Sequence, residues 1–212
     1  MSDKLPNRKK IRFENYDYSD FGVYYITVCT KDKQRIFWTN KTFSAYKVLG
    51  DAGISVGVVL QPPPVAEKGS KALSEITSNR QCIYAQRIAT IFQTGRYYPP
   101  AFTIVGQYVY KAVLEIHRHY PFIFVDTFTI MPNHIHLLLR IDNMIEAENS
   151  VVFSKTKSIS TVIGQMKRTV SAQAGYSVWQ KSFYDRIVRN DKEYSEIWQY
   201  INSNPFVWEK DY

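Results

Sequence analysis

Two histidines separated by one residue are the part of this sequence best suited to chemistry. His134 and His136 lie in the run MPNHIHLLLR, in which Ile135, Leu137 and Leu139 are apolar. Successive side chains of a β-strand alternate between its faces, so both imidazoles would share one face while the apolar residues are buried on the other. Two imidazoles on one face can bind one metal ion. The alternative is a pair of surface histidines on a half-exposed strand.

A second pair with the same spacing provides a comparison within the chain. His117 and His119 fall in a segment whose apolar residues have helical spacing. Residues two apart on a helix point roughly 200° from each other, so this pair cannot easily share a metal ion. We therefore expect metal binding only at His134 and His136.

A tyrosine and an asparagine near the end of the sequence lie four residues apart. Tyr200 and Asn204 would project from one side of a helix, at the flank of its apolar stripe. A tyrosine hydroxyl, with an unperturbed pKa of about 10, acts as a nucleophile only where a positive centre stabilises its phenolate. Tyr184 and Tyr194 are rival candidates. Asn204 could equally cap the helix, which we expect to end there because Pro205 disfavours helical geometry at the residue before it.

Basic side chains are interleaved with aromatic ones in the last third of the sequence. Basic residues neutralise phosphates and aromatic residues stack on bases, although a solvated helix face with core aromatics explains the same pattern. The candidates for contacts with nucleic acid are Lys155, Lys157, Lys167, Arg168, Trp179, Lys181, Arg186 and Arg189.

The elements that must position these residues follow from hydrophobic periodicity and its breaks. We predict a strand over Gly22–Thr30, a helix over Ile104–His119, a β-type run over Phe122–Ile141 interrupted at Pro132, an acidic turn over Asp142–Asn149, a basic helix over Ser158–Ala174 and a final helix over Lys192–Asn202. This order favours an α+β fold in which helices cover one face of an antiparallel sheet and the other face is free for a ligand.

Composition indicates a basic globular protein. The formal net charge is +8, with the excess toward both ends of the chain, which favours a polyanionic partner. Cys29 and Cys82 lack the spacing of a zinc site or disulfide framework. No stretch is apolar enough to span a membrane, so we expect a cytoplasmic protein. Residues 1–212 fit one domain, and glycines and prolines between about 47 and 100 indicate an insertion in it.

Three motifs, taken in order, resemble one known family. The runs MPNHIHLLL (131–139), WQKSFYDRIVRN (179–190) and YINSNP (200–205) together closely resemble the REP-associated branch of the single-tyrosine HUH transposases, the IS200-like superfamily. The resemblance covers the strand near Gly22–Thr30 and about Ile104–Trp208, whereas about Lys47–Pro100 departs from it.

The resemblance implies a fold and a role for each matching residue. The fold would be the ferredoxin-like or RNA-recognition-like sheet of HUH nucleases, with helices packed on one face and the tyrosine on a C-terminal helix. His134 and His136 would be metal ligands, Tyr200 the nucleophile and Asn204 the third protein ligand, a position where more distant members carry Gln. Two neutral imidazoles and an amide leave a hard cation such as Mg²⁺ or Mn²⁺ with its full charge to bind the scissile phosphate.

The resemblance also implies a reaction and a partner. Tyr200 would become linked to the 5′-phosphate, and a free 3′-OH could reverse the step without ATP. The substrate would be single-stranded DNA, often hairpins formed by palindromic repeats, bound by a monomer or a homodimer. Two alternatives stay open: a domesticated module that binds repeat nucleic acid without cutting it, and a zinc hydrolase, which the absence of an HExxH pattern disfavours.

Overall fold

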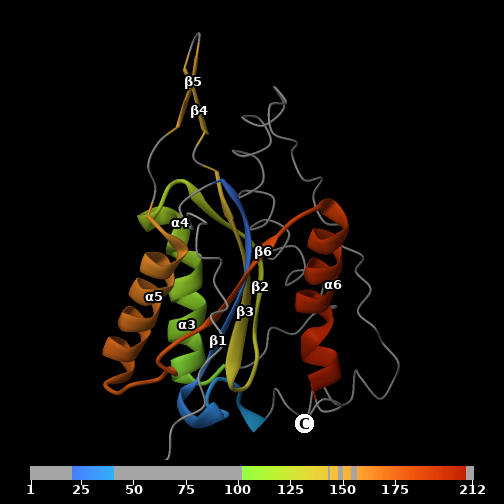
Figure 1. Cartoon of the computed structure of the whole chain (residues 1–212). Helices are drawn as coiled ribbons and strands as arrows, with labels where there is room; N and C mark the ends of the chain where they lie inside the picture. Colours follow the sequence, from blue (N-terminus) through green and yellow to red (C-terminus); the bar gives the residue numbers. More distant parts are fainter. Residues whose placement is uncertain (1–20, 41–101, 143, 148–149, 154–156, 209–212) are drawn as a thin grey trace, which may run out of the picture.

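Four strands form one antiparallel sheet in the order β2-β3-β1-β6 (Figure 1). The computed structural model describes residues 21–40, 102–142, 144–147, 150–153 and 157–208, without the side chains of 144–147, 150–153, 206 and 207. The strands are β1 (Gly22–Cys29), β2 (Ile123–Ile130), β3 (His134–Ile141) and β6 (Tyr184–Val188). Helices connect β1 to β2 and β3 to β6, which is the β-α-β-β-α-β order of a ferredoxin-like fold. The predicted α+β fold with an antiparallel sheet is confirmed.

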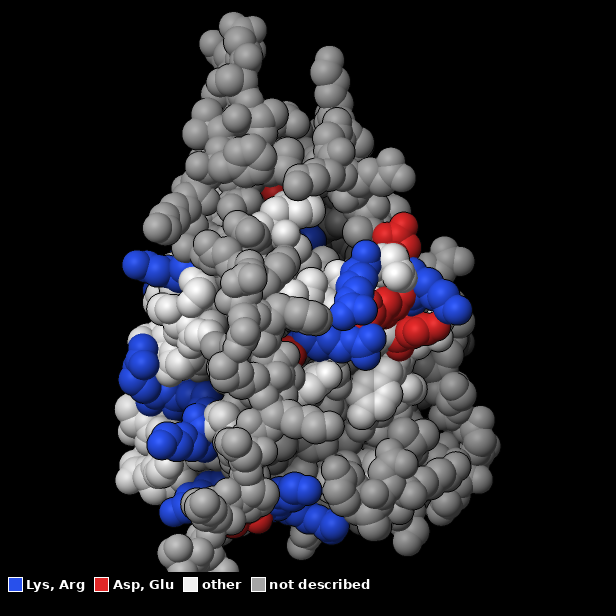
Figure 2. Space-filling model, in the orientation of Figure 1, with Lys and Arg blue, Asp and Glu red and all other residues white. Residues whose placement is uncertain are grey.

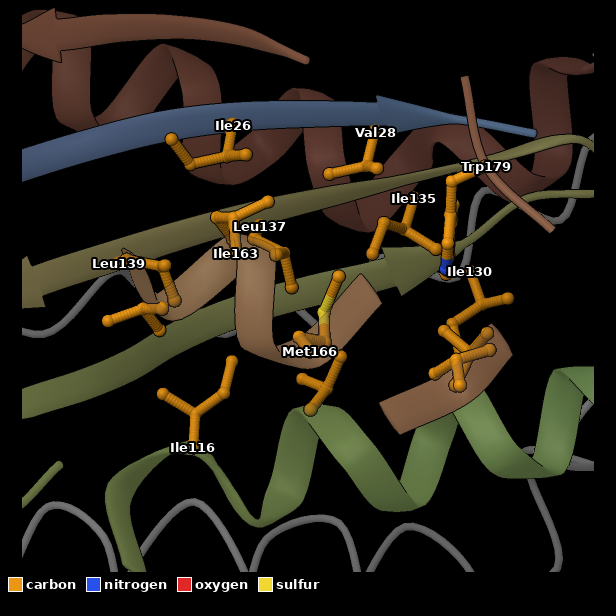
Figure 3. Close-up of a cluster of buried hydrophobic side chains, with 14 of the residues drawn as sticks. Ile26, Val28, Ile116, Ile130, Ile135, Leu137, Leu139, Ile163, Met166 and Trp179 are labelled. Atoms are coloured by element: carbon orange, nitrogen blue, oxygen red, sulfur yellow. The ribbon is translucent and has the colours of Figure 1, made fainter. Parts of the chain in front are cut away.

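Two helices cover one face of the sheet and enclose the main core. They are α3 (Ile104–Leu114), which the short α4 (Ile116–His119) follows, and α5 (Ile159–Ala174). Side chains of Thr103 and Ser158 cap the first turns of α3 and α5, and Gly175 ends α5 in a left-handed conformation. Apolar residues from alternate positions of β1 and β3 meet the apolar stripes of these helices in the layer between them (Figure 3).

The last helix lies on the opposite face of the sheet (Figure 1). Helix α6 (Asp191–Val207) places Tyr194, Trp198 and Ile201 against Leu138 of β3 and Val23 of β1 in a second, smaller cluster. The expectation that this face is free for a ligand is therefore wrong in part. The apolar stripe of α6 needs an apolar surface, and Leu138 and Val23 supply it among the polar residues of this face.

Other elements also differ from those predicted: β6 was not expected as a strand, and the predicted helix over Ile104–His119 is divided into α3 and α4. α6 continues to Val207 with Pro205 inside it, beyond the predicted end near Asn204. A proline lacks the backbone N–H, and its ring disturbs the hydrogen bonding of the preceding turn of a helix. Here Pro205 and Trp208 are both buried, and this burial favours continuation of the helix past the proline. In place of the predicted acidic turn, β4 (Met144–Ala147) pairs with β5 (Ser150–Phe153) in a hairpin that extends from the end of the sheet (Figure 1).

The predicted insertion at about 47–100 and Lys155 lie outside the described residues. No helix among the described residues is long and apolar enough to cross a membrane.

Candidate active site

Two imidazole rings meet at the start of β3. His134 and His136 are 7% and 4% exposed, and their Nε2 atoms lie 3.0 Å apart. As the alternation along the strand predicts, both rings lie on one face, whereas Ile135 between them is part of the main core. Their burial excludes the alternative of two surface histidines. The other pair behaves as predicted for a helix, because His117 contacts the carbonyl oxygen of Ile123 and His119 faces Glu115.

The hydrogen-bond partner of His134 fixes its tautomer. Its Nδ1 atom lies 2.7 Å from Oδ1 of Asn133, and the amide nitrogen of Asn133 donates to the carbonyl oxygen of Lys33 at 3.3 Å. Because Oδ1 can only accept, Nδ1 of His134 carries the hydrogen and Nε2 presents a lone pair toward His136. Asn133 thus orients one imidazole and ties it to the loop after β1.

His136 has two hydroxyl partners on the neighbouring strand. Its Nδ1 atom lies 2.8 Å from the hydroxyl of Tyr25 and 2.9 Å from that of Thr27. Hydroxyls donate or accept, so this nitrogen can carry the hydrogen and leave Nε2 free as a ligand. In that form both Nε2 lone pairs point at one another, an arrangement that a positive centre between them would stabilise.

Burial keeps both histidines neutral. It lowers the pKa of His134 to about 4, with a further contribution from the charge of Lys33, and the pKa of His136 to about 3, with a further contribution from His134. Both rings are therefore uncharged at neutral pH, the state in which imidazole binds a metal. The same burial raises the pKa of Tyr25 well above its ordinary value, so its hydroxyl stays protonated beside His136.

The pair fits a divalent cation. Ligand atoms of Mg²⁺ lie about 2.1 Å from the ion, so two ligands at a right angle are roughly 3.0 Å apart. The observed Nε2 separation is the same, 3.0 Å. Among the described residues, no cluster of three or more His, Cys, Asp or Glu side chains suited to a metal occurs.

Two aromatic residues at the end of α6 lie beside the histidines. The ring of Tyr200 lies 5.3 Å from that of His136, and the ring of Trp208 lies 5.7 Å from that of His134. Tyr200, Asn204 and Trp208 are spaced four apart and Trp208 keeps helical geometry, so they stack along one side of the helix. Asn204, which is buried, lies between the other two residues on that side of the helix.

The rival tyrosines occupy different surroundings. Tyr194 is buried, and its hydroxyl donates at 3.2 Å to Asp126, which lies at the bulge of β2 between the partners of Leu138 and Leu139 and not beside the histidines. Tyr184 of β6 is the pairing partner of Thr27 in β1, and Thr27 is in turn the pairing partner of His136 in β3. Tyr184 thus lies two strands, roughly 10 Å, from the pair, whereas Tyr200 contacts it directly.

The candidates for nucleic-acid contacts do not form one patch. Among the described residues, basic side chains gather in separate groups, along the α5 side, at the lower end of the sheet and beside the junction of β6 with α6 (Figure 2). Lys157, Arg168, Lys181, Arg186 and Arg189 are exposed. Arg168 donates to Gln165, and Arg186 forms an ion pair with Glu193.

Two of these candidates have structural roles. Trp179 is buried in the main core against Phe37, with ring centroids 5.3 Å apart, so its expected stacking role does not fit (Figure 3). Burying the large aromatic side chain of Trp179 in the core stabilises the fold more than leaving it exposed beside basic residues. Lys167 donates to the carbonyl oxygens of Gln180 and Lys181 at 2.6 and 3.3 Å, and burial lowers its pKa. It joins α5 to the segment before β6.

Sequence reasoning missed four residues at the site. Tyr25 and Thr27 orient His136, Asn133 orients His134, and Lys33 places a charge beside His134. Lys33 and the preceding Asp32 have positive φ angles, 53° and 54°, a strained conformation that tends to occur at functional sites. Asn133 was within the recognised motif, but the roles of Tyr25 and Thr27 depend on strand pairing that periodicity does not reveal.

Comparisons with known proteins point to one family. A family model for IS200-like transposases matches residues 83–204, more than half of the chain. A Haemophilus influenzae protein of uncharacterised function is 22% identical over 98% of this chain and 93% of its own length. A second protein of that organism, with the provisional name of REP-associated tyrosine transposase, is 29% identical over 45% of this chain and 54% of its own length.

One solved structure also matches the chain. It is that of a REP-associated tyrosine transposase bound to a REP hairpin, which is 14% identical and aligns with a TM-score of 0.46 over 92% of this chain and 72% of that one.

Proposed function

This chain belongs to the IS200-like transposase family, and from that premise we propose that it cleaves and rejoins single-stranded DNA through a 5′-phosphotyrosine intermediate. The observation that carries the proposal is the contact between Tyr200 on α6 and the neutral histidine pair on β3. The matched segment, 83–204, contains all four residues to which we assign chemistry: His134, His136, Tyr200 and Asn204.

The chain's own residues would hold the metal and the nucleophile in place. His134 and His136 would bind a divalent cation, Mg²⁺ or Mn²⁺, with Asn204 as third protein ligand, and Asn133, Tyr25 and Thr27 would fix the rings. Such an ion would polarise the scissile phosphate and stabilise charge in the transition state. All three ligands are neutral, so the attraction for an anionic phosphate would not be offset by negative side chains.

In the reaction, the hydroxyl oxygen of Tyr200 would attack the phosphorus atom. The new bond joins the tyrosine oxygen to the 5′-phosphate, the bond to the 3′-oxygen breaks, the phenolic proton is released and the 3′-oxygen gains one. Tyr200 is 47% exposed, so a DNA strand can reach it. The number of phosphodiester bonds is unchanged, so attack by a free 3′-OH on the phosphotyrosine would restore a DNA strand and free the hydroxyl.

The partner we propose is single-stranded DNA that folds into a hairpin, bound by a monomer or a homodimer. The net charge of +8 suits a polyanion. The exposed residues Lys157, Arg168, Lys181, Arg186 and Arg189, together with Lys155, remain proposed contacts; Trp179 and Lys167 are left out for the structural reasons given above.

A covalent-adduct assay tests this proposal. Hairpin-forming DNA is labelled at either its 5′ or its 3′ end, incubated with protein and Mn²⁺ or Mg²⁺, and separated on a denaturing gel. We expect the 3′ label to migrate with the protein and the 5′ label to appear on a shorter strand. Tyr200→Phe should form no adduct and bind DNA with unchanged affinity, and His134→Ala should cut at least about 100-fold more slowly.

The matched control is Tyr184→Phe, which removes the hydroxyl of a second exposed tyrosine and should retain the adduct. An adduct that persists in Tyr200→Phe would contradict the assignment of the nucleophile. Tight binding of several hairpins without any adduct, in the presence of metal, would favour a binding module that has lost catalysis.

A further inference from the structure

Three tyrosine rings form a row across the sheet face beside the histidines. Tyr25 occupies the middle: the centroid of its ring lies 6.3 Å from that of Tyr184 and 6.4 Å from that of Tyr200. Both neighbours are close to perpendicular to it, with interplanar angles of 69° and 87°. The row begins at the proposed nucleophile and extends toward β6, one of the two edge strands of this sheet.

The central ring is held rigidly. The hydroxyl of Tyr25 is hydrogen-bonded to Nδ1 of His136 at 2.8 Å, and the two rings stack with an interplanar angle of 24°. The ring of Tyr25 therefore has a fixed orientation, and the ring of Tyr184 lies beside it at a steep angle. A ring fixed in this way loses little conformational entropy when a ligand packs against it.

The outer ring is exposed and has no part in the proposed chemistry. Tyr184 is 40% exposed at the start of β6, whereas the apolar residues on this face of the sheet, Val23 and Leu138, are buried under α6. Tyr184 is also aligned across the strands with Thr27 and His136, because Thr27 is the pairing partner of both residues. If a nucleotide is bound beside the histidine pair, its base, or the base of the next nucleotide in the strand, would lie close to the ring of Tyr184.

We propose that Tyr184, supported by Tyr25, is a base-stacking residue that positions a nucleotide adjacent to the scissile phosphate. This proposal rests on the proposed function, because it assumes that single-stranded DNA crosses this face of the sheet. A flat exposed aromatic ring beside a fixed one accepts the face of any base, and such stacking stabilises single strands without requiring a particular sequence. Tyr184 then acts in binding and positioning, in contrast to Tyr200.

Fluorescent DNA tests the assignment in a binding assay with a variant that does not cut. The Tyr200→Phe variant serves as the background, and 2-aminopurine replaces, one at a time, each base within two nucleotides of the cut site, which is mapped first with the wild-type protein. Binding should quench the fluorophore at one of these positions. Tyr184→Ala and Tyr184→Leu should abolish this quenching and weaken binding roughly 5- to 150-fold, whereas Tyr184→Phe, which keeps the ring, should retain both.

Tyr176→Ala is the matched control, because Tyr176 is similarly exposed but lies after α5, outside the tyrosine row. It should leave quenching and affinity unchanged. Equal quenching and affinity in Tyr184→Leu, Tyr184→Ala and the unchanged background would overturn the proposal. If wild-type protein forms the adduct while the Tyr184 variants behave like the background, the stacking role fails and the proposed function stands; if no adduct forms at all, the proposed function itself fails.

Discussion

The two histidines of the site differ in how firmly each is held. Nδ1 of His134 is hydrogen-bonded to Asn133, whereas Nδ1 of His136 has the hydroxyls of both Tyr25 and Thr27 within reach. If the hydroxyl of Thr27 is removed, His136 keeps its partner Tyr25. If the amide of Asn133 is removed, the ring of His134 loses its Nδ1 partner and can rotate. Groups that orient metal-bound histidines influence metal affinity almost as much as the ligands do.

We therefore predict unequal effects on metal binding. Asn133→Ala should weaken the binding of Mn²⁺ about 10- to 100-fold, whereas Thr27→Val should have a much smaller effect, as measured by isothermal titration calorimetry. Asn133→Asp keeps an acceptor for Nδ1 of His134 and should restore most of the affinity. Equal losses in Asn133→Ala and Thr27→Val would show that orientation of His134 is not the limiting factor.

At this scale, the sequence was informative about residues with local patterns. Alternation along the strand placed His134 and His136 on one face, and the spacing of Tyr200 and Asn204 placed them on one side of a helix. Tyr25 escaped notice because it is 111 residues from its partner His136, and its role depends on which strand lies beside β3. Strand order is a property of the whole sheet that one strand's sequence does not determine.

At the scale of elements, α3 depends on the absence of one side chain. A Cβ atom on Gly106 would collide with the backbone carbonyl of Phe37 and lie 2.9 Å from Cβ of Phe102. α3 can therefore pack this closely only with glycine at that position. Gly164 in α5 is different, because an added Cβ would meet only the flexible end of Arg168, at 3.6 Å.

Substitution by alanine should consequently have opposite effects at these two glycines. Gly106→Ala should lower the free energy of unfolding by about 1–3 kcal/mol, because α3 or the Phe37 segment must shift. Gly164→Ala should raise it by about 0.5–1 kcal/mol, because alanine stabilises a helix interior relative to glycine. Chemical denaturation followed by circular dichroism measures both. A stabilising Gly106→Ala would contradict the close packing of α3 against Phe37.

Most strands and helices were predicted more accurately than their placement, although β4, β5 and β6 were not predicted as strands. Periodicity located β1, the pair β2 and β3, α3 and α5 to within a few residues, because each has one continuous apolar side. The sequence of α6 did not indicate which face of the sheet the helix covers. An apolar stripe shows that a helix packs against an apolar surface, but it does not identify that surface. Its length was underestimated because Pro205 was given more weight than the burial of Pro205 and Trp208.

At the scale of the molecule, positive charge is spread around the protein, and its effect should depend on position. Lys33 lies at the histidine end of the sheet, where its charge already lowers the pKa of His134. Lys192 lies in the first turn of α6 and faces Glu196. Both lysines are exposed, but only Lys33 is placed to meet a phosphate bound at the proposed site.

The affinity for single-stranded DNA should fall with salt, and Lys33 should contribute to that dependence. Each phosphate contact adds about −0.7 to the slope of log affinity against log salt for single strands. Lys33→Ala, measured by fluorescence anisotropy in the Tyr200→Phe background, should make the slope shallower by about 0.7. Lys192→Ala should leave it unchanged. Equal slopes for both variants and the background would place the bound strand away from Lys33.

The separation of α6 from the main core has an evolutionary consequence. The sheet, α3 and α5 share one core to which none of the described side chains of α6 belongs, although Trp208 directly after the helix does, and α6 carries the proposed nucleophile. A stop codon or frameshift near Asn190 would remove the cutting residue while leaving most of that core and the histidine strand intact. One mutation would thus separate the proposed histidine site from the proposed nucleophile, and a growing chain would carry no such nucleophile until α6 had been synthesised.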